Sequence, residues 1–257
     1  MSSQNHIQQA HNHVVELADP LQVLSDFYRQ IVLIKRSLEL HRLEQEVSLF
    51  LQVDRLPSDQ EMAEVISARL QHWIDKKRAA AAKVLTEKEF SRIDETLYVA
   101  AALADELFIL EIEWSGKKYW HSVLLEESVF HSCYAGENFF KGVIRLLNER
   151  AVDTQQRNLM AVYFLTLRLG FSGRYRDQPK NLETIRNKLF KRINNGVGDK
   201  EPLVCPQAYE HLFASMQEYR LAPLTRWKKM MVNGFLLYLL LGWVVWNSFT
   251  GVWDISL

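Results

Sequence analysis

The sequence predicts an all-α protein: a helical domain followed by one C-terminal transmembrane helix. The chain has only 10 glycines and 6 prolines in 257 residues, few for a protein rich in β-turns. No segment sustains the alternation of apolar and polar residues that marks a half-buried strand. No charged residue occurs from Met230 to Trp253. A helix of that length spans the roughly 30 Å hydrocarbon core of a bilayer.

The residues that flank this uncharged segment predict its orientation. Arg226, Lys228 and Lys229 precede it, and Asp254 is the only charged residue after it. Because basic residues concentrate on the cytoplasmic side of a membrane, we expect the helical domain in the cytoplasm. Trp227 and Trp246 suit the two interfacial aromatic belts. A buried core helix is the alternative, but the length, the lysines and the terminal position argue against it.

The predicted organisation has five parts. They are a disordered polar tail (1–15), a cytoplasmic helical domain (16–222), a basic juxtamembrane linker (223–229), a transmembrane helix (230–253) and a short tail beyond the membrane (254–257). The N-terminus lacks the pattern of a signal peptide. Lys+Arg and Asp+Glu both number 31, so no global charge attracts nucleic acid. Cys133 and Cys205 are expected to be buried thiols, since a cytoplasmic domain needs no disulfide.

Three helix starts are marked by capping boxes, in which a Ser, Thr or Asp precedes a Glu or Gln by three residues. The pairs are Ser58–Glu61, Thr86–Glu89 and Asp153–Gln156. The second pair opens a helix that we expect to end near residues 114–116. It has an apolar stripe from Phe90 to Phe108 and a second apolar edge, and we expect it in the middle of the domain. The third opens a helix that stops at Gly170.

Apolar residues at helical spacing predict the other helices. The predicted segments are a stripe from Leu17 toward Phe50, then Tyr119–Phe130, Asn138–Arg150, Asn181–Asn194 and Gln207–Tyr219. We expect the polar, basic segment 171–179 to be a loop and 198–206 to be a linker.

The strongest candidate for chemistry is the carboxylate pair Asp105-Glu106. Two carboxylates can act as acid and base, but neighbouring residues on a helix point about 100° apart. A structural or partner-binding role is therefore favoured over catalysis. His131 and Cys133 form a weak pair for zinc or nucleophilic chemistry, and no established catalytic or phosphate-binding motif is present. We predict no catalytic, cofactor-binding or metal site.

Charge is segregated along the chain although it balances overall. Residues 86–113 hold eight acidic and two basic side chains, and residues 168–192 hold eight basic and two acidic ones. Two solvated faces, an internal contact between them, or docking surfaces for other proteins would each explain this. One specific hypothesis is that Arg174 or Arg168 pairs with Asp105 and fixes the 171–179 loop against the central helix.

The order of several motifs is that of a known family. The motifs are Phe27-Tyr28, residues 98–106 (YVAAALADE), Trp120 with Leu124-Leu125, residues 136–140 (GENFF), residues 163–169 and residues 170–175 (GFSGRY). From about Leu21 to Phe249 the chain resembles the DotU/TssL family, also called IcmH. This family provides the tail-anchored inner-membrane component of type VI secretion systems and their type IVB relatives.

The resemblance implies a cytoplasmic hook-like domain of two packed three-helix bundles and a single-pass protein of the bacterial inner membrane with a periplasmic C-terminus. It implies self-association, a TssM/IcmF-type inner-membrane partner, an indirect link to an outer-membrane lipoprotein, baseplate components on the cytoplasmic side, and a scaffold without enzymatic activity. Asp105, Glu106, Glu137 and Arg174 are carried over as assembly residues. Gly136, Phe139, Phe140, Gly170, Gly173 and Tyr175 are carried over as structural residues. Trp227, Lys228, Lys229 and Trp246 are assigned to the anchor, which contacts lipid.

Three alternatives stay open. The chain could be a tail-anchored hydrolase that uses Asp105 and Glu106, the equivalent subunit of a type IVB system, or a tail-anchored adaptor outside secretion.

Overall fold

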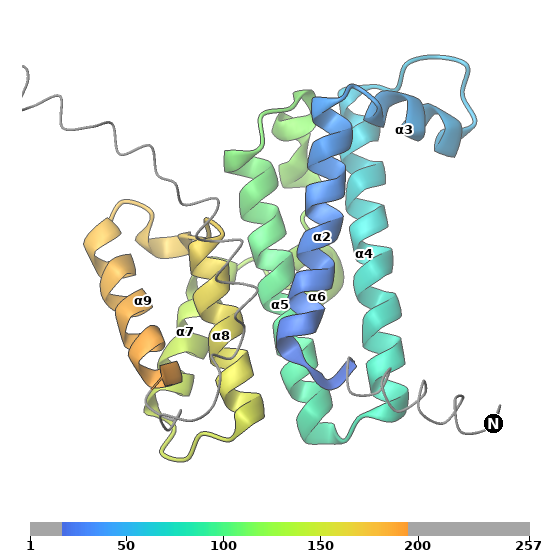
Figure 1. Cartoon of the computed structure of the whole chain (residues 1–257). Helices are drawn as coiled ribbons and strands as arrows, with labels where there is room; N and C mark the ends of the chain where they lie inside the picture. The colour runs from blue at the N-terminus through green and yellow to red at the C-terminus, as the bar shows by residue number, and fades with distance from the viewer. Residues whose placement is uncertain (1–16, 195–257) are drawn as a thin grey trace, which may run out of the picture. The chain divides into compact units, whose positions relative to one another are not determined.

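The computed structural model describes residues 17–194, in which every regular element is a helix and there is no strand (Figure 1). The all-α prediction is therefore confirmed for it. Its α-helices are α2 (Pro20–Glu39), α3 (Leu43–Leu51), α4 (Asp59–Val84), α5 (Glu87–Glu106), α6 (Leu125–Phe130), α7 (Ala135–Asn148), α8 (Thr154–Arg168) and α9 (Pro179–Asn194). A π-helical turn, η1 (Leu107–Glu111), extends α5, and two 3₁₀ segments are η2 (Ser115–Ser122) and η3 (Gly173–Tyr175).

Several predictions fall outside the described residues. These are the N-terminal tail, the helix 207–219, Cys205, the juxtamembrane linker, the 230–253 span with Trp227, Lys228, Lys229 and Trp246, and the final four residues. Within 17–194, no helix combines the length and the apolar character needed to cross a bilayer.

The three capping boxes begin helices as predicted. The side chains of Ser58, Thr86 and Asp153 accept from the backbone N–H three residues ahead, and Glu61, Glu89 and Gln156 bond back to the capping residue. Each box satisfies two of the four N–H groups that a helix leaves without partners at its start. Local sequence alone therefore fixes where α4, α5 and α8 begin.

The helices pack in two groups that share α5 as their common wall. One group contains α2, α4 and α5, and η2 and α6 also pack on it. The other contains α7, α8 and α9, and Figure 1 shows these three side by side. Helix α5 contacts α2 and α4 as well as α7 and α8. This agrees with the central position predicted from its two apolar edges.

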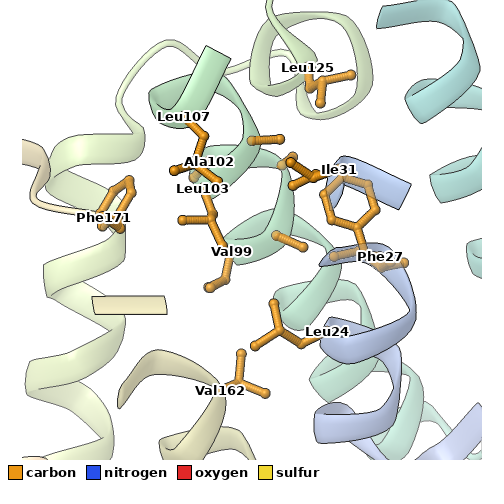
Figure 2. Close-up of a cluster of buried hydrophobic side chains, with 14 of the residues drawn as sticks. Leu24, Phe27, Ile31, Val99, Ala102, Leu103, Leu107, Leu125, Val162 and Phe171 are labelled. Atoms are coloured by element: carbon orange, nitrogen blue, oxygen red, sulfur yellow. The ribbon is translucent and has the colours of Figure 1, made fainter. Parts of the chain in front are cut away.

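The apolar core runs through α5 from one group to the other. Figure 2 shows Leu24, Phe27 and Ile31 of α2 on one side of α5, and Val162 of α8 with Phe171 on other sides. From Val99 to Glu106 every residue of α5 is buried. Four of these residues are the alanines 100, 101, 102 and 104, whose small side chains let neighbouring helices approach closely. The helix can therefore be covered on all sides.

Two predicted helices are interrupted. The stripe from Leu17 toward Phe50 is two helices, because the chain turns at residues 40–42 with His41 at a positive φ of 52°. The predicted helix Tyr119–Phe130 is instead the 3₁₀ segment η2 followed by α6. Its break coincides with a contact from α5 that holds the start of α6, and that contact joins residues 20 positions apart. Periodicity along the sequence does not reveal it.

Candidate assembly site

Asp105, one residue before the end of α5, holds α6 and η2 in place. One carboxylate oxygen accepts from the Trp120 indole N–H and the Leu125 backbone N–H, and the other accepts from the Glu126 N–H, each at 2.9 Å. Leu125 and Glu126 are the first residues of α6, whose own N-cap residue, Leu124, makes no side-chain cap. A carboxylate at a helix N-terminus also faces the positive end of the helix dipole. Asp105 is thus a helix cap supplied from another helix.

Burial governs the ionisation of this carboxyl. Asp105 is 6% exposed. Loss of hydration raises its pKa from 3.8 to about 6, although the three hydrogen bonds oppose the shift. Burial disfavours the charged form, whereas donors pointing at the carboxylate favour it. The charge is therefore retained near neutral pH at a cost in stability.

Glu106 turns away from Asp105 and binds the loop that follows α8. Its carboxylate accepts from the backbone N–H of Ser172 at 3.0 Å and of Gly173 at 3.1 Å, and also from the Ser172 hydroxyl. Arg176 adds a longer contact of 3.4 Å. Glu106 is 8% exposed. The neighbouring carboxylates therefore have separate partners, as their angular separation on the helix predicted, and Glu106 joins α5 to the second helical group.

The hypothesis that Arg174 pairs with Asp105 is wrong. Asp105 accepts hydrogen bonds from Trp120, Leu125 and Glu126. Arg174 donates to the Tyr175 hydroxyl at 2.8 Å, and its guanidinium lies over the rings of Tyr175 and Phe140. The loop is fixed to α5 as expected, but the residue of α5 that holds it is Glu106. The donors from the loop are mainly backbone amides, and the pattern of charged side chains in the sequence does not show where backbone amides point.

The two glycines of this loop are required by its geometry. Gly170 has a φ of +119° and directs the chain out of α8, and Gly173 has a φ of +46°. A Cβ on Gly173 would lie 3.1 Å from the Cα of Gly136 and 3.1 Å from the Phe171 ring. Gly136 is in the first turn of α7. The loop and α7 therefore touch backbone to backbone, which only glycine at both positions permits without displacement.

An aromatic cluster lies beneath this contact. Phe139 packs against Phe171 at 4.4 Å and Tyr163 at 4.8 Å between ring centroids. The Phe140 and Tyr175 rings pack edge to face, with their centroids 4.6 Å apart. An edge-to-face pair contributes about 0.5–1.5 kcal/mol beyond the buried area. The predicted structural motif residues are thus brought together in one place, where α7, α8 and the 170–176 loop meet.

Glu137 and Arg174 lie at the surface of the same junction. Glu137 is exposed and lies 3.8 Å from Lys141 one turn later. Arg174 is exposed above the aromatic rings. The backbone nitrogen of Arg174 would lie 3.3 Å from a Cβ placed on Gly136, the residue before Glu137. Of the four predicted assembly residues, Asp105 and Glu106 are therefore internal, and Glu137 and Arg174 are accessible.

Two further acids, the buried Glu126 and the half-buried Glu95, were not singled out from the sequence. Glu126 accepts from the Tyr98 hydroxyl at 2.7 Å, the Ser132 hydroxyl at 2.7 Å and the Tyr134 N–H at 3.0 Å. Burial and this carboxylate raise the pKa of Tyr98 to about 12. The sequence signal for this contact is limited to Tyr98, which belongs to the 98–106 motif given above.

Glu95 is the other missed acid. It accepts from the Tyr163 hydroxyl at 2.6 Å and pairs with Arg145, which joins α5, α7 and α8. Burial raises the pKa of Tyr163 well above its usual value. A Cβ on Gly142 would lie 2.2 Å from the Tyr163 hydroxyl. Gly142 therefore leaves the space through which this hydroxyl reaches Glu95.

The weaker candidates for chemistry do not form a site. Cys133 is exposed, so the expectation of a buried thiol is wrong. Desolvation and the carboxylates of Glu127 and Glu126 raise its pKa, which disfavours the nucleophilic thiolate. Across residues 17–194, no three His, Cys, Asp or Glu side chains gather as a metal ion requires.

A family model described as type VI secretion system protein DotU matches residues 43–249 of this chain. The chain belongs to the DotU family. Among solved structures, the cytoplasmic domain of TssL from Acinetobacter baumannii is similar, with a TM-score of 0.50 and 19% sequence identity. That match covers 69% of this chain and 98% of the TssL domain. A comparison with curated proteins finds no match.

DotU membership points to a component of the type VI secretion membrane complex. The TssL likeness, at 19% identity, supports the helical fold alone. The motif residues carried over from the resemblance then divide into a set that makes contacts between helices and an exposed charged pair, Glu137 and Arg174.

Proposed function

We propose that this DotU-family protein is a non-enzymatic scaffold of the type VI secretion membrane complex. It would be anchored in the bacterial inner membrane by the 230–253 segment, with its helical domain in the cytoplasm. It would bind a TssM/IcmF-type inner-membrane protein, baseplate components and further copies of itself.

The proposal rests on the hydrogen bonds that Asp105 and Glu106 accept within the protein. Both carboxylates are buried and receive their hydrogen bonds from the protein's own backbone and side chains. A hydrolase would need at least one of them free to reach a substrate or a water. Their arrangement favours a role in holding the assembly-competent shape over a role in bond chemistry.

The accessible residues Glu137 and Arg174 are the proposed partner-binding positions. They carry opposite charges beside a rigid glycine and aromatic junction. Rigid elements lose less entropy on binding than mobile loops do, and complementary charges give specificity. The same junction is fixed to α5 by Glu106, so a partner bound there would contact a well-defined surface.

The test is co-purification of the full chain with the TssM/IcmF-type protein of the same organism. Glu137→Lys and Arg174→Glu are expected to weaken the complex about tenfold or more each, while thermal unfolding shifts little because both side chains are exposed. Lys76→Glu, an exposed residue on α4, is the matched control and should bind like the wild type. A wild-type chain that binds no such partner and leaves the membrane fraction would refute the proposal.

A further inference from the structure

The two helical groups carry opposite charge. Residues 17–133 contain 20 acidic and 14 basic side chains, whereas residues 134–194 contain 5 acidic and 12 basic ones. Helix α9 alone holds five basic residues against one acid, Glu183. A balanced total therefore conceals a basic second group, and a field of this kind attracts an anionic partner.

On that group, α7 and α9 enclose a hollow of about 450 Å³. Ile144, Leu147 and Asn148 line it on the α7 side, and Lys188, Lys191 and Arg192 line it on the α9 side. Ile144 is 51% exposed, and both lysines are exposed. The hollow thus offers an uncovered apolar surface beside three cations.

In the described part of the chain, the two lysines of this hollow are not engaged in ion pairs. None of the ion pairs within 17–194 involves Lys188 or Lys191. Arg192 is half-buried and donates to the backbone carbonyl of Glu149, so it contributes its charge to the wall of the hollow. A phosphate group would satisfy the ammonium donors of the two exposed lysines.

We propose that the hollow between α7 and α9 binds the headgroup of an anionic phospholipid. The phosphate would lie against Lys188, Lys191 and Arg192, and Ile144 would contact the apolar region below the headgroup. Lipid is favoured over an acidic protein because α9 ends at Asn194, only 36 residues before the uncharged segment that begins at Met230. A chain of that length spans at most roughly 120 Å at full extension, so α9 cannot move far from the bilayer once the chain is anchored, and this argument rests on the proposed anchoring.

The test uses the full chain labelled with an environment-sensitive fluorophore at Asn187→Cys, an exposed position on α9, with Cys133 and Cys205 replaced by Ser. The protein is incubated with vesicles of phosphatidylcholine alone or with added phosphatidylglycerol. We expect the label to shift to an apolar environment only with phosphatidylglycerol, and high salt to reverse the shift.

Lys188→Glu combined with Lys191→Glu is expected to raise the phosphatidylglycerol needed for half the response by about tenfold or more. The matched control, Lys76→Glu with Lys83→Glu on α4, should respond like the unmodified chain. Equal responses to both vesicles, or no effect of the α9 reversals, would overturn the proposal. A label that stays in water with both vesicles would also overturn it and direct attention to an acidic protein.

Flotation of the same chain with phosphatidylcholine vesicles reports on the anchor separately. A chain that does not float but whose label responds to phosphatidylglycerol would refute the anchor and support the hollow. A chain that floats but whose label does not respond to phosphatidylglycerol would support the anchor and refute lipid binding in the hollow.

Discussion

Asp105 and Glu106 are consecutive, chemically alike and almost equally buried, yet they stabilise different parts of the molecule. Asp105 stays within the first helical group, where it caps α6 and holds Trp120. Glu106 crosses to the second group through the backbone of Ser172 and Gly173. The difference teaches that a short acidic motif can fix one domain internally and join it to its neighbour at the same time.

The largest effect is expected at Asp105. Replacing it by Ala leaves the Trp120 indole and two α6 amides without partners, and each unsatisfied buried donor costs about 1–3 kcal/mol. We therefore expect Asp105→Ala to lower the free energy of unfolding by about 3 kcal/mol or more, measured by chemical denaturation. Hydrogen exchange should accelerate first at Leu125 and Glu126. Equal acceleration at Ser172 and Gly173 would break the distinction between the two carboxylates.

A pH series measures the burial of Asp105 directly. Because its pKa rises from 3.8 in the unfolded chain to about 6 in the fold, the folded state holds more protons between these pH values. Stability therefore falls as pH rises through this window, by up to about 3 kcal/mol. The free energy of unfolding of the wild type, minus that of Asp105→Asn, should be largest near pH 4 and should decrease toward pH 7. A difference that is flat with pH would mean that the carboxyl ionises as in water.

Sequence reasoning succeeded where the determinants are local. Ser58 and Glu61 lie within one turn, so the start of α4 could be predicted, and the two apolar edges of α5 gave its central position. The partners of Asp105 lie 15 to 21 residues away and depend on how η2 and α6 return to α5. Charge patterns favoured an arginine for Asp105, but the donors are mainly backbone amides, which every residue except proline carries and no pattern distinguishes.

Glu106→Gln should have a smaller effect than the Asp105 substitutions. The amide keeps one acceptor for Ser172 but loses the charge and presents an N–H group to Gly173. Loss of a charged hydrogen-bond partner costs about 1.5–3 kcal/mol, and part of that cost is offset by the retained contacts. We expect a loss of about 1–2 kcal/mol in the free energy of unfolding. Exchange should accelerate at Ser172 and Gly173 while Leu125 and Glu126 stay protected, the reverse of the Asp105 pattern.

The smallest effect is expected at Arg176, which forms an ion pair with Glu106. Its guanidinium lies 3.4 Å from Glu106, and its side chain is 52% exposed. Because the guanidinium is half exposed and its contact with Glu106 is long, we expect the pair to contribute no more than about 1 kcal/mol. Arg176→Ala should therefore change the free energy of unfolding by less than about 0.5 kcal/mol and leave the exchange at Ser172 and Gly173 unchanged. A loss as large as that of Glu106→Gln would mean that charge, and not the loop amides, joins α5 to the second group. Lys180→Ala, an exposed residue at the start of α9, is the control for removing a nearby positive charge.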